Sequence, residues 1–89
     1  MDIVRNAVAG TLESNDVLVS VTPGQGQLDI TVQSIVLEQF GDAIRAAVEG
    51  ACEDQGVTDA KVTIEDRGAL DCTIRARVET ALKRAGGTR

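Results

Sequence analysis

Residues 17–34 read VLVSVTPGQGQLDITVQS, and this stretch decides the fold class. Its first part, residues 17–22, is apolar and rich in β-branched side chains, and it ends at Pro23-Gly24 as a strand does before a turn. Its last part, residues 28–34, alternates apolar and polar side chains, which is typical of a half-buried strand. Because only a short turn separates the two parts, they are predicted to pair as an antiparallel hairpin.

Downstream of this stretch the hydrophobic period lengthens to three and four residues. Apolar side chains recur in this way from Val36 to Ala51, which predicts an amphipathic helix of about five turns. Ser34 is the expected cap of its first turn and Gly56 its expected end. Phe40 lies in the apolar stripe, so we expect its side chain to be buried against a second helix.

A further strand and helix complete the pattern. Residues 60–66, AKVTIED, predict a strand, and the helix after it is expected to end at Gly86-Gly87. Two ion pairs with the i, i+4 spacing are expected on this helix, Asp71 with Arg75 and Glu79 with Lys83. Its apolar stripe consists of Leu70, Ile74, Val78, Ala81 and Leu82.

These elements predict an α+β domain in which two helices cover one face of a small, largely antiparallel sheet of three or four strands. The order is strand, strand, helix, strand, helix, and residues 7–12 are compatible with an extra strand at the N-terminus. The 89 residues are expected to form one domain, 1–89. We expect its first few residues and residues 86–89 to be flexible.

Composition narrows the classes of function. The formal net charge of −5 and the single aromatic residue argue against binding to nucleic acids or to anionic membranes. The N-terminal sequence MDIVRNAVAG has no long apolar run, so neither a signal peptide nor a membrane span is expected, and a cytoplasmic location follows. An acidic surface of this kind suits docking to basic protein surfaces, and the alternative is that the charge only keeps the domain in solution.

The residues needed for independent catalysis are scarce. The sequence has no histidine, so the commonest general base near neutral pH is missing. Two cysteines without histidine do not make an ordinary zinc site, and no metal site is predicted. Both Cys52 and Cys72 are expected to be buried as small apolar side chains. The chain is therefore not expected to be an enzyme on its own.

Residues 11–16, TLESND, form a short polar segment just before the strand predicted at residues 17–22. Such a segment predicts an exposed loop, with Ser14 close to the acids Glu13 and Asp16. Two interpretations of Ser14 are open from the residues alone. Its hydroxyl either supports the turn or is the site that a modifying enzyme reaches.

Three separated segments bear a family resemblance. AGTLESNDVLVSV near the N-terminus, QFGDAIR at residues 39–45 and DRGALDCTIRARVETAL at residues 66–82 resemble the acyl carrier (gamma) subunit of citrate lyase, in the same order and spacing. In that family the serine of the AGTLES segment bears the prosthetic group, and this position corresponds to Ser14. The resemblance thus implies a covalently modified serine and no catalytic residue.

The same resemblance implies a cofactor and partners. The cofactor would be 2′-(5″-phosphoribosyl)-3′-dephospho-coenzyme A, attached covalently, whose thiol carries acetyl and citryl thioesters while citrate is cleaved to acetate and oxaloacetate. The partners would be the acyltransferase (alpha) and lyase (beta) subunits and the transferase that attaches the group. Glu13 and Asp16 are candidate recognition residues beside the attachment site.

Three other interpretations remain. The acyl carrier subunit of malonate decarboxylase uses a similar prosthetic group. An ordinary phosphopantetheine carrier is disfavoured, because those proteins are four-helix bundles whereas this chain is rich in strands. A structural or regulatory α+β module would leave Ser14 unmodified.

Overall fold

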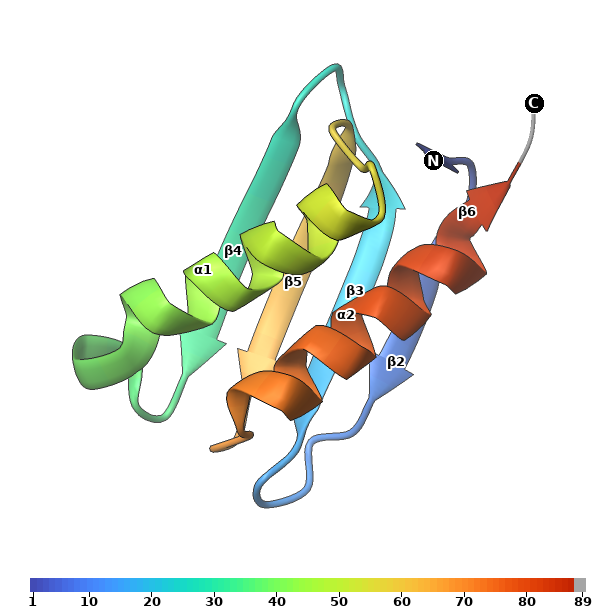
Figure 1. The fold of residues 1–89 in the computed structure, drawn as a ribbon. Helices are drawn as coiled ribbons and strands as arrows, with labels where there is room; N and C mark the ends of the chain where they lie inside the picture. Colours follow the sequence, from blue (N-terminus) through green and yellow to red (C-terminus); the bar gives the residue numbers. More distant parts are fainter. Residues whose placement is uncertain (88–89) are drawn as a thin grey trace.

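The computed structural model describes residues 1–87 and has four main strands and two helices (Figure 1). The strands β2 (Ala7–Gly10), β3 (Val17–Pro23), β5 (Ala60–Asp66) and β4 (Leu28–Ser34) lie side by side in that order. The helices are α1 (Leu37–Asp54) and α2 (Asp71–Ala85). This arrangement confirms the predicted α+β class, and β2 is the expected extra strand.

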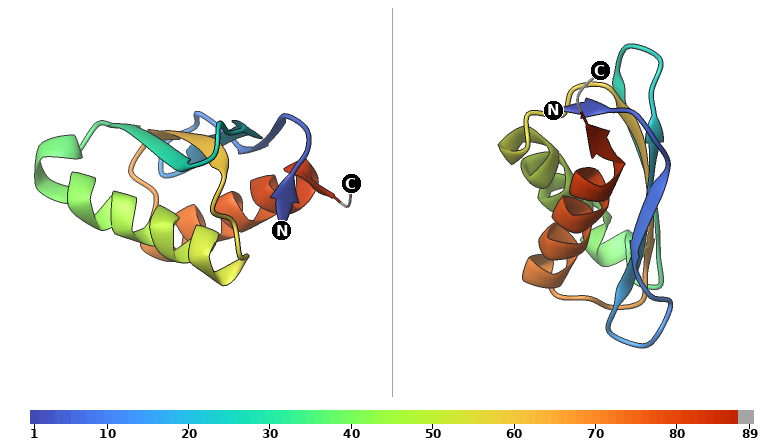
Figure 2. Two further views of the ribbon diagram at one scale, coloured as in Figure 1. Left: turned by 90° about the horizontal axis from the view of Figure 1, so that it is seen from above. Right: turned by 90° about the vertical axis from the view of Figure 1, so that its right-hand side faces the viewer.

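The two helices pack on the same face of the sheet (Figure 2). The buried face of the central strands carries valine and isoleucine at alternate positions, and Val62 and Ile64 of β5 are fully buried. The helices contribute Val48, Ile74 and Val78 to the same core. Alternation in the strands and the period of three to four in the helices therefore meet in one apolar layer. Neither helix has the length and hydropathy needed to cross a membrane within the described residues.

The two ends of the chain meet in a small second sheet. β1 (Asp2–Ile3) pairs antiparallel with β6 (Gly86–Gly87), and the Ile3 side chain is buried. α2 ends just before Gly86, as predicted. The flexibility expected for both ends stays a prediction, and residues 88 and 89 lie outside the described part of the chain.

The predicted hairpin of residues 17–34 is wrong. β3 and β4 do not pair with each other, because β5 lies between them, antiparallel to β3 and parallel to β4. β4, α1 and β5 form a strand–helix–strand unit whose strands pair in parallel, and such a connection needs a crossover helix of this length. The hairpin that does form joins β2 to β3. Two of the three pairings are antiparallel, so the sheet is largely antiparallel as expected.

The segment between β3 and β4, residues 24–27, crosses the start of β5 and does not form a hairpin turn. It spans two strand spacings, about 10 Å, across the start of β5. A Cβ atom at Gly24 would lie 2.7 Å from the backbone nitrogen of Ala60, so this close passage needs glycine. The Asp59 carboxylate accepts a hydrogen bond from the Gly26 N–H at 2.9 Å and fixes the loop there.

The predicted burial of the helix starts is also wrong. Phe40 is 53% exposed and Leu70 is 71% exposed, whereas Ile44 and Ile74, one turn further along each helix, are buried. Leu70 precedes α2, and the first turn of α1 projects past the edge of the sheet (Figure 1). The apolar period is correct, but no sheet lies beneath the first turn to cover it.

Three smaller expectations are corrected as well, and two are confirmed. Cys72 is exposed while Cys52 is buried as predicted. α1 begins at Leu37 without a side-chain cap, and the Ser34 hydroxyl instead donates a hydrogen bond to Asp66. Lys83 pairs with Glu79 at 2.8 Å as predicted. The expected partner of Asp71 pairs elsewhere, because Arg75 contacts Asp54 at 2.6 Å across the two helices.

Candidate functional site

One edge of the sheet gathers three connecting segments. Val17 at the start of β3 is paired with Asp66 at the end of β5, and Ser34 at the end of β4 is paired with the same residue. Both helices therefore begin at this edge, and the β2–β3 loop, residues 11–16, lies beside them. We call this edge the serine end.

Ser14 lies at the tip of the β2–β3 loop and is exposed. Within residues 1–87 its hydroxyl makes no hydrogen bond, so the interpretation in which this hydroxyl supports the turn finds no contact to support it. The turn is made by the backbone instead: Asn15 adopts φ 65°, and the Asp16 N–H donates to the Glu13 carbonyl at 3.1 Å. Asparagine tolerates this left-handed conformation better than most residues.

The loop is bound to the connection between β5 and α2. The Asn15 N–H donates to the carbonyl of Arg67 at 2.8 Å, and the Arg67 N–H donates to the carbonyl of Asp16 at 2.9 Å. These two bonds continue the β3–β5 ladder beyond its last paired residues. They hold the backbone directly after Ser14 against the central strand of the sheet.

The Asp16 side chain supplies a second anchor. Its carboxylate accepts hydrogen bonds from the Thr11 hydroxyl at 2.7 Å, from the Val17 N–H at 2.8 Å and from two nitrogens of Arg77 on α2 at 3.2 Å each. The Thr11 and Val17 bonds, with Arg77 adding to them, lower the pKa of Asp16 from 3.8 to about 2. Asp16 therefore joins both strands of the hairpin and α2.

Gly10 brings β2 close to β3 where the loop begins. It has φ +90°, and a Cβ atom built there would clash with the carbonyl oxygen of Val17. Only glycine satisfies both the conformation and the close approach. The glycine of the AGTLES segment is therefore needed by the backbone, four residues before Ser14.

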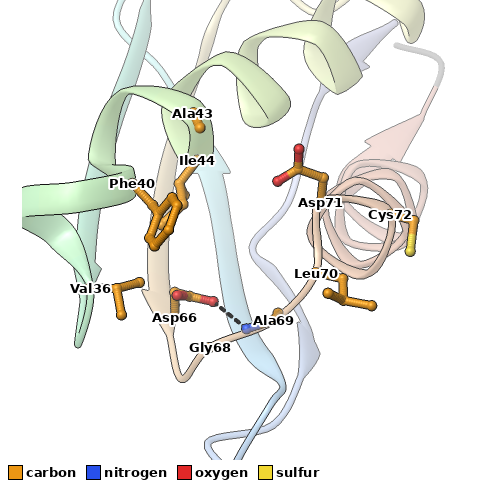
Figure 3. A pocket seen from close by; sticks show the side chains of 10 residues that line it. All are labelled: Val36, Phe40, Ala43, Ile44, Asp66, Gly68, Ala69, Leu70, Asp71 and Cys72. Atoms are coloured by element: carbon orange, nitrogen blue, oxygen red, sulfur yellow. Dashed lines mark hydrogen bonds between the residues drawn. The ribbon is translucent and has the colours of Figure 1, made fainter.

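An apolar groove of about 600 Å³ opens between the starts of α1 and α2 (Figure 3). Asp66, 3% exposed, lies at its base and accepts hydrogen bonds from the Ser34 hydroxyl at 2.8 Å and the Ala69 N–H at 2.9 Å. These bonds join the two segments that precede the helices. The residues lining the groove are Val36, Phe40, Ala43, Ile44, Asp66, Gly68, Ala69, Leu70, Asp71 and Cys72.

The three residues predicted for the site lie together on one loop, but in different settings. Ser14 and Glu13 are exposed, whereas the Asp16 side chain is only 15% exposed and is engaged by its partners. Sequence reasoning missed Arg77, which is 61 residues away from Asp16 and carries no local signal. It also missed Gly10, although a glycine next to a turn was a usable sign.

The described residues show no cluster that would hold a metal ion. In particular, no three or more histidine, cysteine or acidic side chains converge there. At the serine end, the Ser14 hydroxyl makes no hydrogen bond to residues 1–87. It lies on a loop that is held by hydrogen bonds, next to an apolar groove. That arrangement can present a covalently attached group.

Comparisons with known proteins agree on a carrier family. Residues 4–85 match the family model described as ACP, malonate decarboxylase delta subunit (MdcD). The citrate lyase acyl carrier protein of Albidiferax ferrireducens is 53% identical over 98% of this chain and 90% of the relative. That of Treponema denticola is 52% identical over 96% and 97%.

A solved structure shares the fold. A chain from the crystal structure of a Pseudomonas malonate decarboxylase hetero-tetramer in complex with malonate superposes with a TM-score of 0.81 and 29% identity, over 92% of this chain and 84% of that one. The match along nearly the whole length makes the chain a member of the acyl carrier protein family that includes the citrate lyase acyl carrier proteins and the malonate decarboxylase delta subunit.

Proposed function

We propose that this chain is the acyl carrier subunit of a citrate lyase and bears 2′-(5″-phosphoribosyl)-3′-dephospho-coenzyme A on Ser14 through a phosphodiester. The observation that carries this proposal is the Ser14 hydroxyl, which is exposed and makes no hydrogen bond to residues 1–87. It lies at the tip of a loop that is held on both sides. When bound, the group supplies a thiol that holds the acyl group as a thioester. The protein's own residues then have the task of presentation.

The residues present fit such a group. Attachment of a bulky phosphodiester needs an accessible hydroxyl whose loss disturbs nothing else, and Ser14 meets both conditions. Asn15, Asp16 and Arg67 hold the backbone beside it through the bonds described above. A fixed attachment point keeps the acyl group at high effective concentration near the partner subunits. A carrier needs no general base of its own for this.

Citrate lyase is favoured over malonate decarboxylase by sequence identity. The curated relatives at 45–53% identity are named citrate lyase acyl carrier proteins, whereas the chain of the malonate decarboxylase structure is 29% identical. Malonate decarboxylase remains the second candidate, because the matching family model bears that description. We infer that the partners are the acyltransferase and lyase subunits, together with the transferase that attaches the group.

We also propose that recognition at the loop depends on Glu13. The sequence predicts this role for Glu13 and Asp16 together, but the Asp16 carboxylate already has three partners in the fold. Glu13 is exposed and next to the attachment site, so its charge is presented to an approaching protein. Asp16 supports recognition by holding the loop in shape.

Reconstitution with the alpha and beta subunits tests the proposed reaction. The holo wild-type chain should support cleavage of citrate with these subunits, and it should not support decarboxylation of malonate when combined instead with the other subunits of a malonate decarboxylase. Ser14→Ala should abolish cleavage. Its free energy of unfolding should stay within about 0.5 kcal/mol of the wild-type value, because an exposed loop hydroxyl adds little stability. Full activity of Ser14→Ala, or activity on malonate alone, would contradict the proposal.

A further inference from the structure

Exposed large apolar side chains collect at the serine end. Of the seven in the described part of the chain, five lie on residues 11–16, 35–42 and 66–72, and only Met1 and Val8 lie elsewhere. Exposed apolar patches of this kind mark protein interaction sites. The five are Leu12, Ile35, Leu37, Phe40 and Leu70, with exposed fractions between 47% and 71%.

Two of these side chains line the groove, and Leu12 lies on the β2–β3 loop. Phe40 and Leu70 line the groove from its two sides, and Figure 3 shows the Phe40 ring above Val36 and Asp66. Gly68 connects the groove to the loop, because a Cβ atom there would lie 3.6 Å from the Asn15 side chain. The groove therefore adjoins the loop that carries Ser14.

The excess of acidic over basic residues lies on the same three segments as the exposed apolar side chains. The segments 11–16, 35–42 and 66–72 contain six acids and one base, while the rest of the chain has eight of each. Of the six, Asp16 is paired with Arg77 and Asp66 is buried. The acids of these segments that remain exposed are Glu13, Glu38, Asp42 and Asp71, and Asp71 lines the groove.

We propose that this groove is the docking site of a partner subunit that inserts an apolar side chain flanked by basic residues. The inference rests on the proposed carrier function and names the surface through which it acts. Complementary charge favours a basic partner, whereas a second copy of this chain would bring two acidic rims together. The phosphate-bearing group attached to Ser14 would meet the same repulsion if it folded back onto this surface.

Binding of purified alpha and beta subunits to holo variants tests the surface. Phe40→Ser and Leu70→Ser should each weaken the dissociation constant for at least one subunit by about tenfold or more, since central apolar anchors dominate an interface. Val8→Ser is the matched control: Val8 is 56% exposed but lies on β2, away from the groove, so binding should stay within about twofold. Equal binding by all three variants would overturn the proposal.

The salt dependence of binding tests the contribution of the exposed acids on these segments. Wild-type binding should weaken as ionic strength rises, and Glu13→Gln should flatten that dependence. If binding is independent of salt for the wild type, the basic character assigned to the partner is wrong.

Phe40 reports directly on occupancy, because it is the only aromatic residue of the chain. With 4-fluorophenylalanine incorporated there, the single ¹⁹F resonance should move when a partner subunit is added and stay unchanged when the group is attached to Ser14. A shift on attachment alone would show that the group fills the groove, and partner binding without a shift would place the interface elsewhere. Either result overturns the proposal.

Intact mass separates this proposal from the carrier function. A chain that carries the added mass on Ser14 but binds neither subunit contradicts the docking site alone. A chain that never acquires the mass contradicts the carrier function itself.

Discussion

Asp16 shows how one side chain organises the loop that presents Ser14. Its carboxylate receives the Thr11 hydroxyl from the β2 side of the loop, the Val17 N–H from β3 and the Arg77 guanidinium from α2. Each of these donors favours the ionised carboxylate, and together they lower its pKa to about 2. The loop therefore depends on a charge that persists in moderately acidic solution.

The order of the loop should follow the titration of Asp16. The folded pKa is below the ordinary value of 3.8, so the stabilisation is fully present above about pH 4 and is lost as the pH falls toward 2. The amide resonances of Asn15 and Asp16 should change over this range. Arg77→Gln should raise the midpoint, while Arg75→Gln, which removes an exposed pair on the same helix, should leave it unchanged. A midpoint near 3.8 in the wild type would contradict the anchor.

At this scale the sequence predicted the exposed loop that carries Ser14 but not the contacts that hold this loop. The polar segment 11–16 indicates an exposed loop with Ser14 on it, because its residues favour turns. The same segment does not distinguish an acid that faces a partner from one held by the fold. That distinction depends on Arg77, which only the packing of α2 brings to Asp16.

The hairpin that carries Ser14 depends on Gly10. Two glycines provide a matched pair, because Gly10 and Gly26 have similar φ values of 90° and 97°, but only Gly10 is crowded by another strand. Gly26→Ala should cost only the conformational strain of its positive φ, about 1 kcal/mol. Gly10→Ala should cost about 1–3 kcal/mol in addition to that strain, because its methyl group meets the Val17 carbonyl.

Thermal unfolding measures the difference between the two glycine variants. Each kcal/mol corresponds to about 4–8 °C in a domain of this size. Gly10→Ala should therefore melt several degrees below Gly26→Ala. Equal melting temperatures would mean that β2 and β3 are not in the close contact described.

Helix α1 changes role along its length. Its later turns are buried against the sheet, with Ile44 only 4% exposed, while Phe40 in its first turn is 53% exposed. Phe40→Ala should therefore cost about 1 kcal/mol or less, and Ile44→Ala about 2–5 kcal/mol. Denaturant unfolding of the two variants measures both values. A loss of about 3 kcal/mol or more on Phe40→Ala is usual for a buried phenylalanine. That result would show that Phe40 is buried, as the sequence predicted.

Element types followed from the sequence more readily than their pairing. The alternation in residues 28–34 and 60–66 predicts β4 and β5 correctly, because side-chain period is a local property. Strand order is not local: β5 enters between β3 and β4 only after α1 has crossed over the sheet. The exposure of Phe40 has a similar cause, since the period of a helix does not show where the sheet beneath it ends.

At the scale of the whole molecule, the topology places its functional features at one end. β4 and β5 are parallel neighbours, so both finish at the same edge and both lead into helices there. The antiparallel β2–β3 hairpin turns at that edge as well. The loop that carries Ser14, the apolar groove and the acid excess are thereby brought together from segments spread over the chain.

This common location gives the carrier account its physical basis. The opposite end of the domain holds the small β1–β6 sheet and the four-residue connection from β3 to β4. A group on Ser14 would leave the domain from the serine end, next to the surface proposed for docking. In the proposed function, one end serves both attachment and recognition, and the rest of the domain supports it.

Intact mass spectrometry of the protein isolated from a host that makes the prosthetic group tests the central claim most directly. The account predicts a single added group with the mass of phosphoribosyl-dephospho-coenzyme A, found on the peptide that contains Ser14 and absent from Ser14→Ala. An unmodified wild-type chain from that host, or the same added mass on the Ser14→Ala variant, would contradict it.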